Sequence, residues 1–179
     1  MAMREVTFRV VGETPLLTHN PMSMGVKEEG KGSKIPTPEV EAERGVYRTA
    51  DGQYALPGLA FRQSLLKAAG AWKDKRSTLK SKLSHIEVTQ ELVPIETADG
   101  KPVEGYEIDV RRAVIQKSGI LRARPKYASW AARVTFKYDS DLCTEEQIGP
   151  VLADAGSRIG VGDYRPERGG WFGRFSVVK

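Results

Sequence analysis

The stretch Ala132-Arg-Val-Thr-Phe-Lys-Tyr138 gives the clearest strand signal in the chain. Its apolar residues alternate with polar ones, and a period of two predicts a strand with one buried face. Thr144-Glu-Glu-Gln147 follows as a capping box, which predicts a helix whose apolar stripe covers residues 148–155. We expect Pro150 to kink or shorten this helix. Residues 171–178 form a last strand, which completes a β-α-β unit.

A comparable unit comes earlier in the chain. Residues 5–11 alternate as a strand, and Pro57-Gly58 opens a helix with apolar residues at helical spacing. Residues 85–95 predict another strand, and residues 103–115 predict one or two more. The order β-α-β-β-α-β indicates an α+β protein of the ferredoxin-like or RRM-like class, with long loop insertions. We expect one domain over residues 1–179, both helices on one face of an antiparallel sheet, and an open face of the kind that often binds RNA.

Two insertions interrupt this pattern. Residues 21–45 are polar and rich in Gly and Pro, so we interpret them as a mobile loop insertion. Residues 96–126 are interpreted as a hairpin and basic insertion, with a turn at Asp99-Gly100 and an exposed connection over residues 117–126. Residues 73–82 are polar and are also expected to form a loop.

The composition excludes several classes of protein. The 179 residues include 28 Lys and Arg against 23 Asp and Glu, a formal net charge of +5. No apolar run approaches the roughly 20 residues needed to span a bilayer, and no hydrophobic signal core precedes the first strand, so we expect a cytoplasmic protein without membrane contact. The single cysteine, Cys143, excludes an internal disulfide framework and a Cys-rich zinc site, and is interpreted as a small apolar filler. We expect neither a metal nor a cofactor.

Basic residues are concentrated in three blocks, which is how a nucleic-acid footprint appears in a sequence. The blocks are residues 62–82, 111–126 and 158–179. We expect them to converge, so that Arg62, Arg124 and Arg165 lie on one continuous positive surface. The alternative is a set of solvated faces that never meet.

The most distinctive segment is the Gly-rich loop from Arg158 to Phe175, where glycines, arginines and aromatic residues coincide. Backbone N–H groups in such a loop can form a concavity for anions, arginines can contact phosphates, and Tyr164, Trp171 or Phe172 can stack on bases. The alternative is a tight turn whose aromatic residues only close the end of the core. No Walker-type motif is present, so nucleotide hydrolysis is not indicated.

Two further segments fit the same ligand. The N-terminus of the helix after Pro57 can hold an anion, with Arg62 one turn further along, although Arg62 could equally be an ordinary surface residue. Arg122-x-Arg124-x-Lys126, followed by Tyr127 and Trp130, interleaves cations with aromatic residues as single-strand binders do. Trp130 could instead only anchor the following strand. The candidate nucleic-acid-binding residues are Arg62, Lys67, Arg111, Arg112, Arg122, Arg124, Lys126, Gly160, Gly162, Tyr164, Arg165, Arg168, Gly169 and Gly170.

Catalysis has little support in the sequence. His19 and His85 are the only imidazoles, and no serine or cysteine motif accompanies either of them. A metal-independent ribonuclease would need a general base and a general acid at a bent phosphate, for which His85 with a tyrosine or lysine is the candidate. We assign no catalytic residue.

The chain resembles the RAMP superfamily, the RRM-like proteins of CRISPR effector complexes, and in particular their guide-RNA backbone subunits. Three stretches carry the resemblance: Thr14-Pro-Leu-Leu17, the helix opening from Ala55 to Lys67, and the Gly-rich loop. The chain is also similar to small phage-encoded proteins with a Pro-Leu-Leu-x-His-Asn-Pro opening and a Gly-x-Gly-Asp-x-Arg-Pro loop, here residues 15–21 and 160–166. The resemblance implies that Arg62 and the Gly-rich loop contact the nucleic-acid backbone, that subunits stack head to tail, and that the insertions hold or wedge the strand.

The leading hypothesis is a non-catalytic protein that cradles single-stranded RNA or DNA and multimerises along it, either alone or within a larger ribonucleoprotein. One alternative is a RAMP-type endoribonuclease. The other is an interaction or structural protein of a phage or mobile element.

Overall fold

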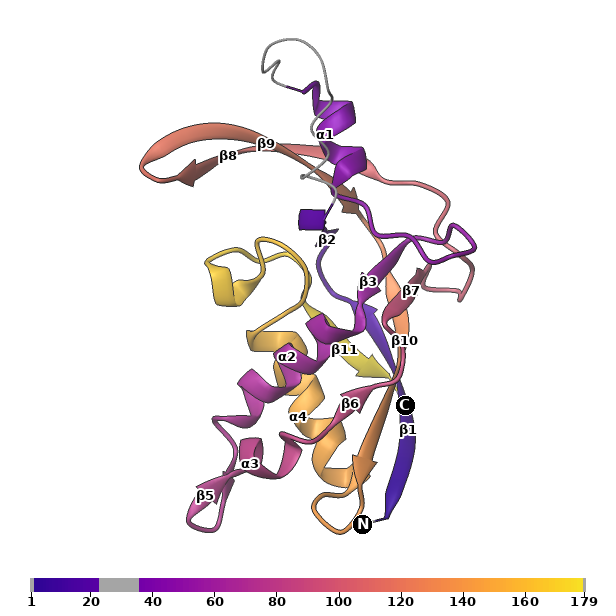
Figure 1. The fold of residues 1–179 in the computed structure, drawn as a ribbon, viewed down its shortest axis with the longest axis vertical. Coiled ribbons are helices and arrows are strands. Elements are labelled where there is room, and N and C mark those ends of the chain that lie inside the picture. The colour runs from indigo at the N-terminus through magenta and orange to yellow at the C-terminus, as the bar shows by residue number, and fades with distance from the viewer. Residues whose placement is uncertain (1, 23–35, 179) are drawn as a thin grey trace.

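The computed structural model describes residues 2–22 and 36–178, which form two main sheets and two long helices (Figure 1). The larger sheet has the order β11-β1-β10-β7-β3, with β6 paired to the far end of β10, and these neighbouring strands run antiparallel. These strands are β1 (Met3–Gly12), β3 (Ala55–Pro57), β6 (Glu87–Val88), β7 (Leu92–Glu96), β10 (Ala131–Asp139) and β11 (Phe175–Val178). Helices α2 (Gly58–Ala69) and α4 (Glu145–Arg158) lie side by side on one face of this sheet. The mixed α+β class and the chain order expected from the sequence are confirmed.

The core lies between the sheet and the two helices. The β1–β10 register places Val6 opposite Phe136 and Val10 opposite Ala132, which puts the buried apolar residues of both strands on the helix side. Helix α4 begins with the capping box at Thr144, whose backbone N–H donates to the side chain of Gln147 at 3.1 Å. The helix continues through Pro150 to Arg158, so the expected shortening does not occur.

The open face of the larger sheet differs from an RNA-stacking platform. Thr7 and Thr135 share a hydrogen bond of 2.8 Å there, and Glu96 pairs with both Arg9 and Arg133. The outward positions of β1 and β10 carry no aromatic side chain within the described residues. The sequence-based expectation that this face could bind bases therefore has no support in the side chains it presents.

The predicted strand over residues 85–95 is split into β6 and β7. Between them the side chain of Gln90 takes the place of a strand backbone: its amide nitrogen donates to the carbonyl of Arg133 at 2.8 Å, and its amide oxygen accepts from the N–H of Thr135 at 2.9 Å. The hydrogen bonding along β10 is therefore continuous although its partner strand is not.

A second sheet joins β2 (Leu16–Leu17) to a long ribbon formed by β8 (Glu107–Ile115) and β9 (Ser118–Tyr127). The interpretation of residues 117–126 as an exposed connection is wrong, because nearly all of them form β9. Their side chains alternate between the two faces of the ribbon, and the charged ones conceal this period in the sequence. Figure 1 shows the ribbon projecting over the Gly-rich loop.

The 21–45 insertion contains an element that its breaker-rich composition conceals. Helix α1 (Pro38–Arg44) starts from the N-cap Thr37, with Pro38 in its first turn, and packs against β9. The remainder of the expected mobile loop, residues 23–35, lies outside the described residues. The expected 73–82 loop also contains structure, namely β4 (Lys73–Asp74), β5 (Ser77–Thr78) and α3 (Leu79–Leu83).

Candidate nucleic-acid interface

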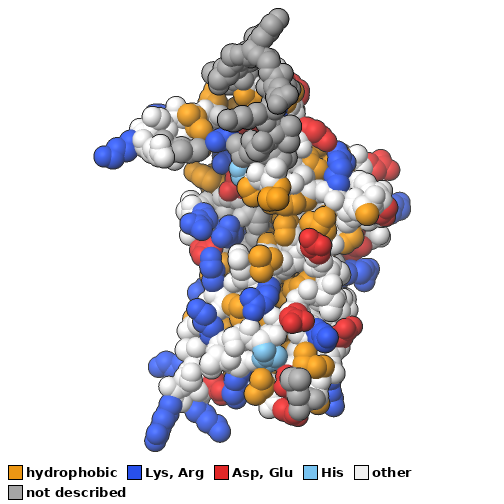
Figure 2. Space-filling model, in the orientation of Figure 1, with side chains coloured by type: hydrophobic (Ala, Val, Ile, Leu, Met, Phe, Trp, Pro, Cys, Tyr) orange, Lys and Arg blue, Asp and Glu red, His pale blue; other side chains and the backbone are white. Residues whose placement is uncertain are grey.

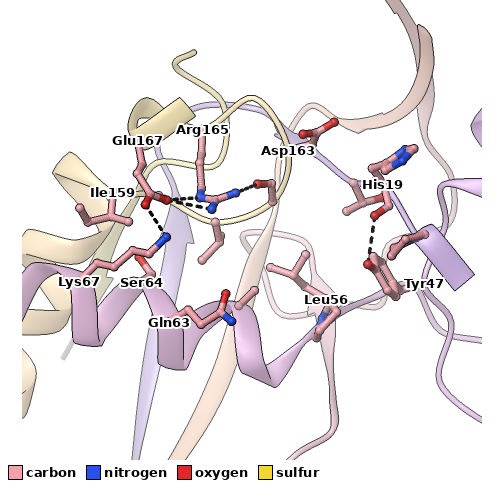
Figure 3. Close-up of a pocket in the computed structure, with 17 residues that line it drawn as sticks. His19, Tyr47, Leu56, Gln63, Ser64, Lys67, Ile159, Asp163, Arg165 and Glu167 are labelled. Carbon is pink, nitrogen blue, oxygen red and sulfur yellow. Dashed lines mark hydrogen bonds and ion pairs between the residues drawn. The ribbon is translucent and has the colours of Figure 1, made fainter. Parts of the chain in front are cut away.

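A cleft of about 300 Å³ lies between α2, the end of β2 and the first half of the Gly-rich loop (Figure 3). Apolar side chains from β3, α2 and the loop form much of its wall, and polar groups line its rim. The lining residues that matter below are Leu56, Ala60, Gln63, Ser64, Lys67 and Asp163, together with Arg165 and Glu167. Three segments that are distant in the sequence therefore meet at this one concavity.

The backbone conformation of the Gly-rich loop requires glycine at two positions. Gly162 has a φ of 77°, and a Cβ there would lie 2.4 Å from the carbonyl oxygen of Leu17. Gly173 has a φ of 68°, and a Cβ would lie 1.8 Å from the carbonyl oxygen of Val161. Both positions need a residue without a side chain. Of the other predicted glycines, Gly160 lines the cleft, Gly169 ends the short 3-10 helix (Pro166–Arg168), and Gly170 packs on the backbone of Tyr164.

The aromatic residues of the loop divide into two groups. Phe172 and Phe175 are buried. Phe175 belongs to the hydrophobic core, as the alternative interpretation expected, whereas Phe172 packs against Tyr164 and Trp171 and has no ring surface free for a base. Trp171 is 57% exposed and Tyr164 is 38% exposed, so both present ring surface to a ligand. Tyr164 also has a φ of 53°, a left-handed conformation that is uncommon for a residue with a side chain.

Two predicted cations meet within the cleft. Lys67 on α2 pairs with Glu167, and Arg165 pairs with the same carboxylate through its Nε at 2.9 Å and an Nη at 2.8 Å. Arg165 also donates to the carbonyl of Gly162 at 3.0 Å. Figure 3 shows Glu167 between the two cations. This network fixes the end of the Gly-rich loop to α2.

A further ion pair joins the ribbon to the loop. Arg124 on β9 is 9% exposed and pairs with Asp163 at the cleft rim. His19 lies on the same side, and its backbone carbonyl accepts a hydrogen bond of 3.1 Å from the Tyr47 hydroxyl. Burial lowers the pKa of His19 below its ordinary value, with the nearby Arg124 acting in the same direction and Asp163 opposing it. Burial therefore favours the neutral form of His19.

The inner face of the ribbon carries the cations that the sequence analysis selected. Directly opposed residues share a face, so the register places Arg111, Arg122, Arg124 and Lys126 together. The guanidinium of Arg111 lies 4.8 Å from the centre of the Phe172 ring and 5.7 Å from that of Trp171, which brings this face against the Gly-rich loop. Each cation has a carboxylate partner; in the order given these are Asp109, Glu41, Asp163 and Glu107.

Three predicted residues lie apart from this arrangement. Arg62 points to the other side of α2, where it donates to the carbonyls of Ile86 at 2.6 Å and Ser84 at 2.7 Å. Arg112 is on the outer face of the ribbon. Arg168 is exposed on the short 3-10 helix, outside the cleft lining. Arg124 and Arg165 thus meet around Asp163 and Gly162 as expected, but Arg62 does not join them.

Much of the basic block over residues 62–82 lies at the opposite end of the molecule. The β4–β5 hairpin and α3 carry Lys73, Lys75, Arg76 and Lys80 there, far from the ribbon (Figure 1). Figure 2 shows basic side chains spread along one edge of the molecule, interrupted by acidic ones. The second and third blocks therefore converge as expected, whereas in the first block Lys67 joins them at the cleft and Arg62 and the hairpin residues lie elsewhere.

The histidine selected for the nuclease alternative is placed away from the cleft. The Nε2 atom of His85 accepts a hydrogen bond of 2.9 Å from the backbone N–H of Asp139, and its Nδ1 is buried without a partner. His85 does not line the cleft. In residues 2–22 and 36–178 no group of three or more His, Cys, Asp or Glu is arranged to hold a metal ion. No helix in those ranges combines the length and apolar character needed to cross a membrane.

Sequence reasoning missed the polar groups that line the cleft beside the cations. Gln63 and Ser64 come from the α2 face next to the core stripe, and Glu167 and Asp163 come from the Gly-rich loop. The i, i+4 spacing of Gln63 and Lys67 was an available signal that both lie on one helix face. Nothing in the sequence paired Glu167 with Lys67, because they are 100 residues apart.

The sequence matches no known protein-family model and no curated protein. Among solved structures it is similar to Cmr6 from Pyrococcus furiosus, with a TM-score of 0.51 and 11% sequence identity. The likeness covers 99% of this chain and 100% of Cmr6. At this identity the comparison establishes the fold alone. Over its whole length the chain thus matches the fold of Cmr6, a RAMP protein, in agreement with the resemblance seen in its motifs.

Proposed function

We propose that the protein is a non-catalytic, RAMP-type subunit that binds single-stranded nucleic acid between the inner face of the ribbon and the Gly-rich loop. The observation that carries this proposal is that Arg111 on the ribbon lies against the Gly-rich loop, whose Trp171 and Tyr164 rings are exposed, on the same face of the ribbon as Lys126. Cations interleaved with exposed aromatic rings allow phosphate contacts and base stacking together. The fold shared with Cmr6 supports the same assignment.

The arginines retain donors for phosphates although they have acidic partners. Arg111 uses its Nε and one Nη on Asp109, at 2.7 and 3.0 Å, which leaves its other Nη available. Arg122 contacts Glu41 through one Nη. Because a guanidinium has five N–H donors, each can bind a phosphate without releasing its carboxylate. The paired carboxylates hold the arginines in position before the ligand arrives.

The test is fluorescence anisotropy of a labelled single-stranded RNA and a labelled single-stranded DNA over a range of salt concentrations. Wild-type protein should bind, and its affinity should fall as salt rises. Arg111→Ala combined with Lys126→Ala should make the slope of log K against log salt shallower by about 1.4, which is about 0.7 for each lost phosphate contact. Failure of the wild-type protein to bind either strand at low salt would contradict the proposal.

The matched control removes the same charge from the opposite end of the molecule. Lys73→Ala combined with Arg76→Ala takes two cations from the β4–β5 hairpin, which lies far from the ribbon. This variant should keep the wild-type slope. An equal effect of both double variants would show that only the net charge of the protein matters. That result would contradict binding of the strand between the ribbon and the Gly-rich loop.

Assembly of several copies along the strand is part of the proposal. The outer face of the ribbon exposes Ile108, Val110, Val114 and Leu121, with exposed fractions from 40 to 71%. Monomeric proteins seldom present contiguous apolar patches of this kind, so we assign the face to contact with a second copy. Light scattering on the complex with a long single strand should show several copies per strand, and Val114→Asp with Leu121→Asp should reduce that number. An unchanged number would refute the assignment of this face.

A further inference from the structure

The charged side chains that line the cleft are held in ion pairs within the protein. Lys67 and Arg165 are the cations among the lining residues, and Glu167 and Asp163 are the carboxylates. Glu167 is shared by the two cations, and Asp163 is paired with Arg124. The neutral side chains of Gln63 and Ser64 line the same cleft and remain to bond an uncharged ligand.

One wall of the cleft offers a hydroxyl without a partner. Ser64 is 2% exposed, and its Oγ has no hydrogen bond within the described structure. A helical serine can ordinarily bond the carbonyl one turn earlier, and buried hydroxyls in folded proteins nearly always find a partner. Gln63, the neighbouring residue on α2, is exposed at the rim and lines the same cleft. A hydroxyl and an amide side by side can both donate and accept.

The remaining wall is apolar and the space is small. Leu56, Ala60, Ile159 and Val161 contribute side chains to the lining, opposite the polar rim. A volume of about 300 Å³ has room for one nucleoside, and it is at the lower end of the range for small-ligand sites. An apolar slot with a few neutral donors and acceptors is the environment in which an unstacked base is read.

We propose that the cleft receives one unstacked nucleobase of the bound strand, with its polar edge on Ser64 and Gln63 and its ring against Leu56 and Val161. The phosphates of the strand then run outside the cleft along the ribbon. This inference rests on the proposed function, because the base reaches the cleft as part of a bound single strand.

The experiment compares a normal single-stranded oligonucleotide with one of the same length in which every nucleotide is abasic. Ser64→Ala should bind the normal strand about 5-fold more weakly than wild-type protein does, the effect of one neutral hydrogen bond. On the abasic strand the two proteins should bind equally. Ser157→Ala, on the exposed end of α4, is the matched control and should change neither affinity.

A second readout does not depend on the Ser64 variant. A strand with 2-aminopurine at single positions should brighten on binding to wild-type protein, because a base that leaves its neighbours for the cleft is no longer stacked. Brightening that is lost in Ala60→Trp, which fills the cleft, supports the proposal. Absence of brightening at every position, or equal weakening of Ser64→Ala on both strands, overturns it. Failure of wild-type protein to bind either strand would instead refute the proposed function.

Discussion

The ion pair between Arg124 and Asp163 joins the ribbon to the Gly-rich loop, and its two ends are unequally buried. The Arg124 side chain is 10% exposed, whereas that of Asp163 is 31% exposed. We therefore expect the two single substitutions to differ in cost. Asp163→Asn leaves a cation in a site with little access to water, while Arg124→Met leaves a carboxylate that water can reach.

The magnitude follows from the two limits for ion pairs. Breaking a fully buried pair costs about 3–5 kcal/mol, and an exposed pair contributes about 0–1 kcal/mol. Arg124 also lies opposite Asp109 in the ribbon, which offsets part of its charge. We expect Asp163→Asn to lower the free energy of unfolding by about 2 kcal/mol and Arg124→Met to lower it by about 1 kcal/mol.

The assay is urea unfolding at pH 7 of the wild-type protein, both single variants and the double variant. Urea is preferred to guanidinium chloride because it does not screen the pair. The double variant should cost less than the sum of the single variants by at least about 1 kcal/mol. The Lys101–Asp99 pair, with side chains 78% and 62% exposed, is the control and should show coupling below about 0.5 kcal/mol. Additive costs at Arg124 and Asp163, or a greater cost for Arg124→Met, would refute the reasoning.

Three further predictions concern single residues. Gly162→Ala should lower the free energy of unfolding by about 2 kcal/mol or more in urea, since its Cβ would meet the carbonyl of Leu17 and φ is positive; an unchanged midpoint would refute the loop geometry. Gln90→Ala should cost about 1–3 kcal/mol, since it leaves the N–H of Thr135 without its side-chain acceptor; Gln90→Glu should lose only the donated bond, and an Ala variant as stable as wild type would contradict this account. The pKa of His19 is lowered by burial, so the unfolded chain binds its proton more readily and stability should fall as pH drops below about 6.5. His19→Gln should flatten that part of the stability profile, and an identical slope in both proteins would contradict the assignment.

The elements of the larger sheet were predictable because their periodicity is uninterrupted. The alternation of β1 and β10, the stripe of α2 and the capping box of α4 all appear in the structure. At these sites the local preference and the tertiary packing agree, so the sequence alone was sufficient.

The ribbon was harder to predict because β9 carries basic residues even at its half-buried and buried positions. Arg122 and Arg124 occupy positions that a buried strand would fill with apolar residues, so the basic residues of β9 indicated a loop. Helix α1 was hidden in the same way by the glycines and prolines around it, although Thr37-Pro38 is a recognisable helix start. Both elements are stabilised by their contact with each other, which no local pattern records.

The sequence indicated that α2 and the Gly-rich loop lie together, but it did not indicate the acidic partners of the cations there. The sequence placed α2 and the Gly-rich loop at one site, which their contact through Lys67 and Glu167 confirms. It gave most of the cations without their partners, because the carboxylates that pair with Arg122, Arg124, Lys126 and Lys67 come from other elements. Net charge along a sequence therefore overstated the positive potential that this surface offers to a phosphate.

The contact of Glu41 with β9 has a consequence for how copies of the chain meet. Strand β9 pairs with β2 only through its last two residues, and at Ala123 its outward N–H is instead accepted by the Glu41 carboxylate at 3.1 Å. A strand edge with unpaired backbone groups can pair with a strand of a neighbouring chain, and repeated pairing of this kind produces fibres. Helix α1 thus blocks this strand edge from pairing with the backbone of another chain. Two copies of the protein would then meet through side chains on the faces of the ribbon.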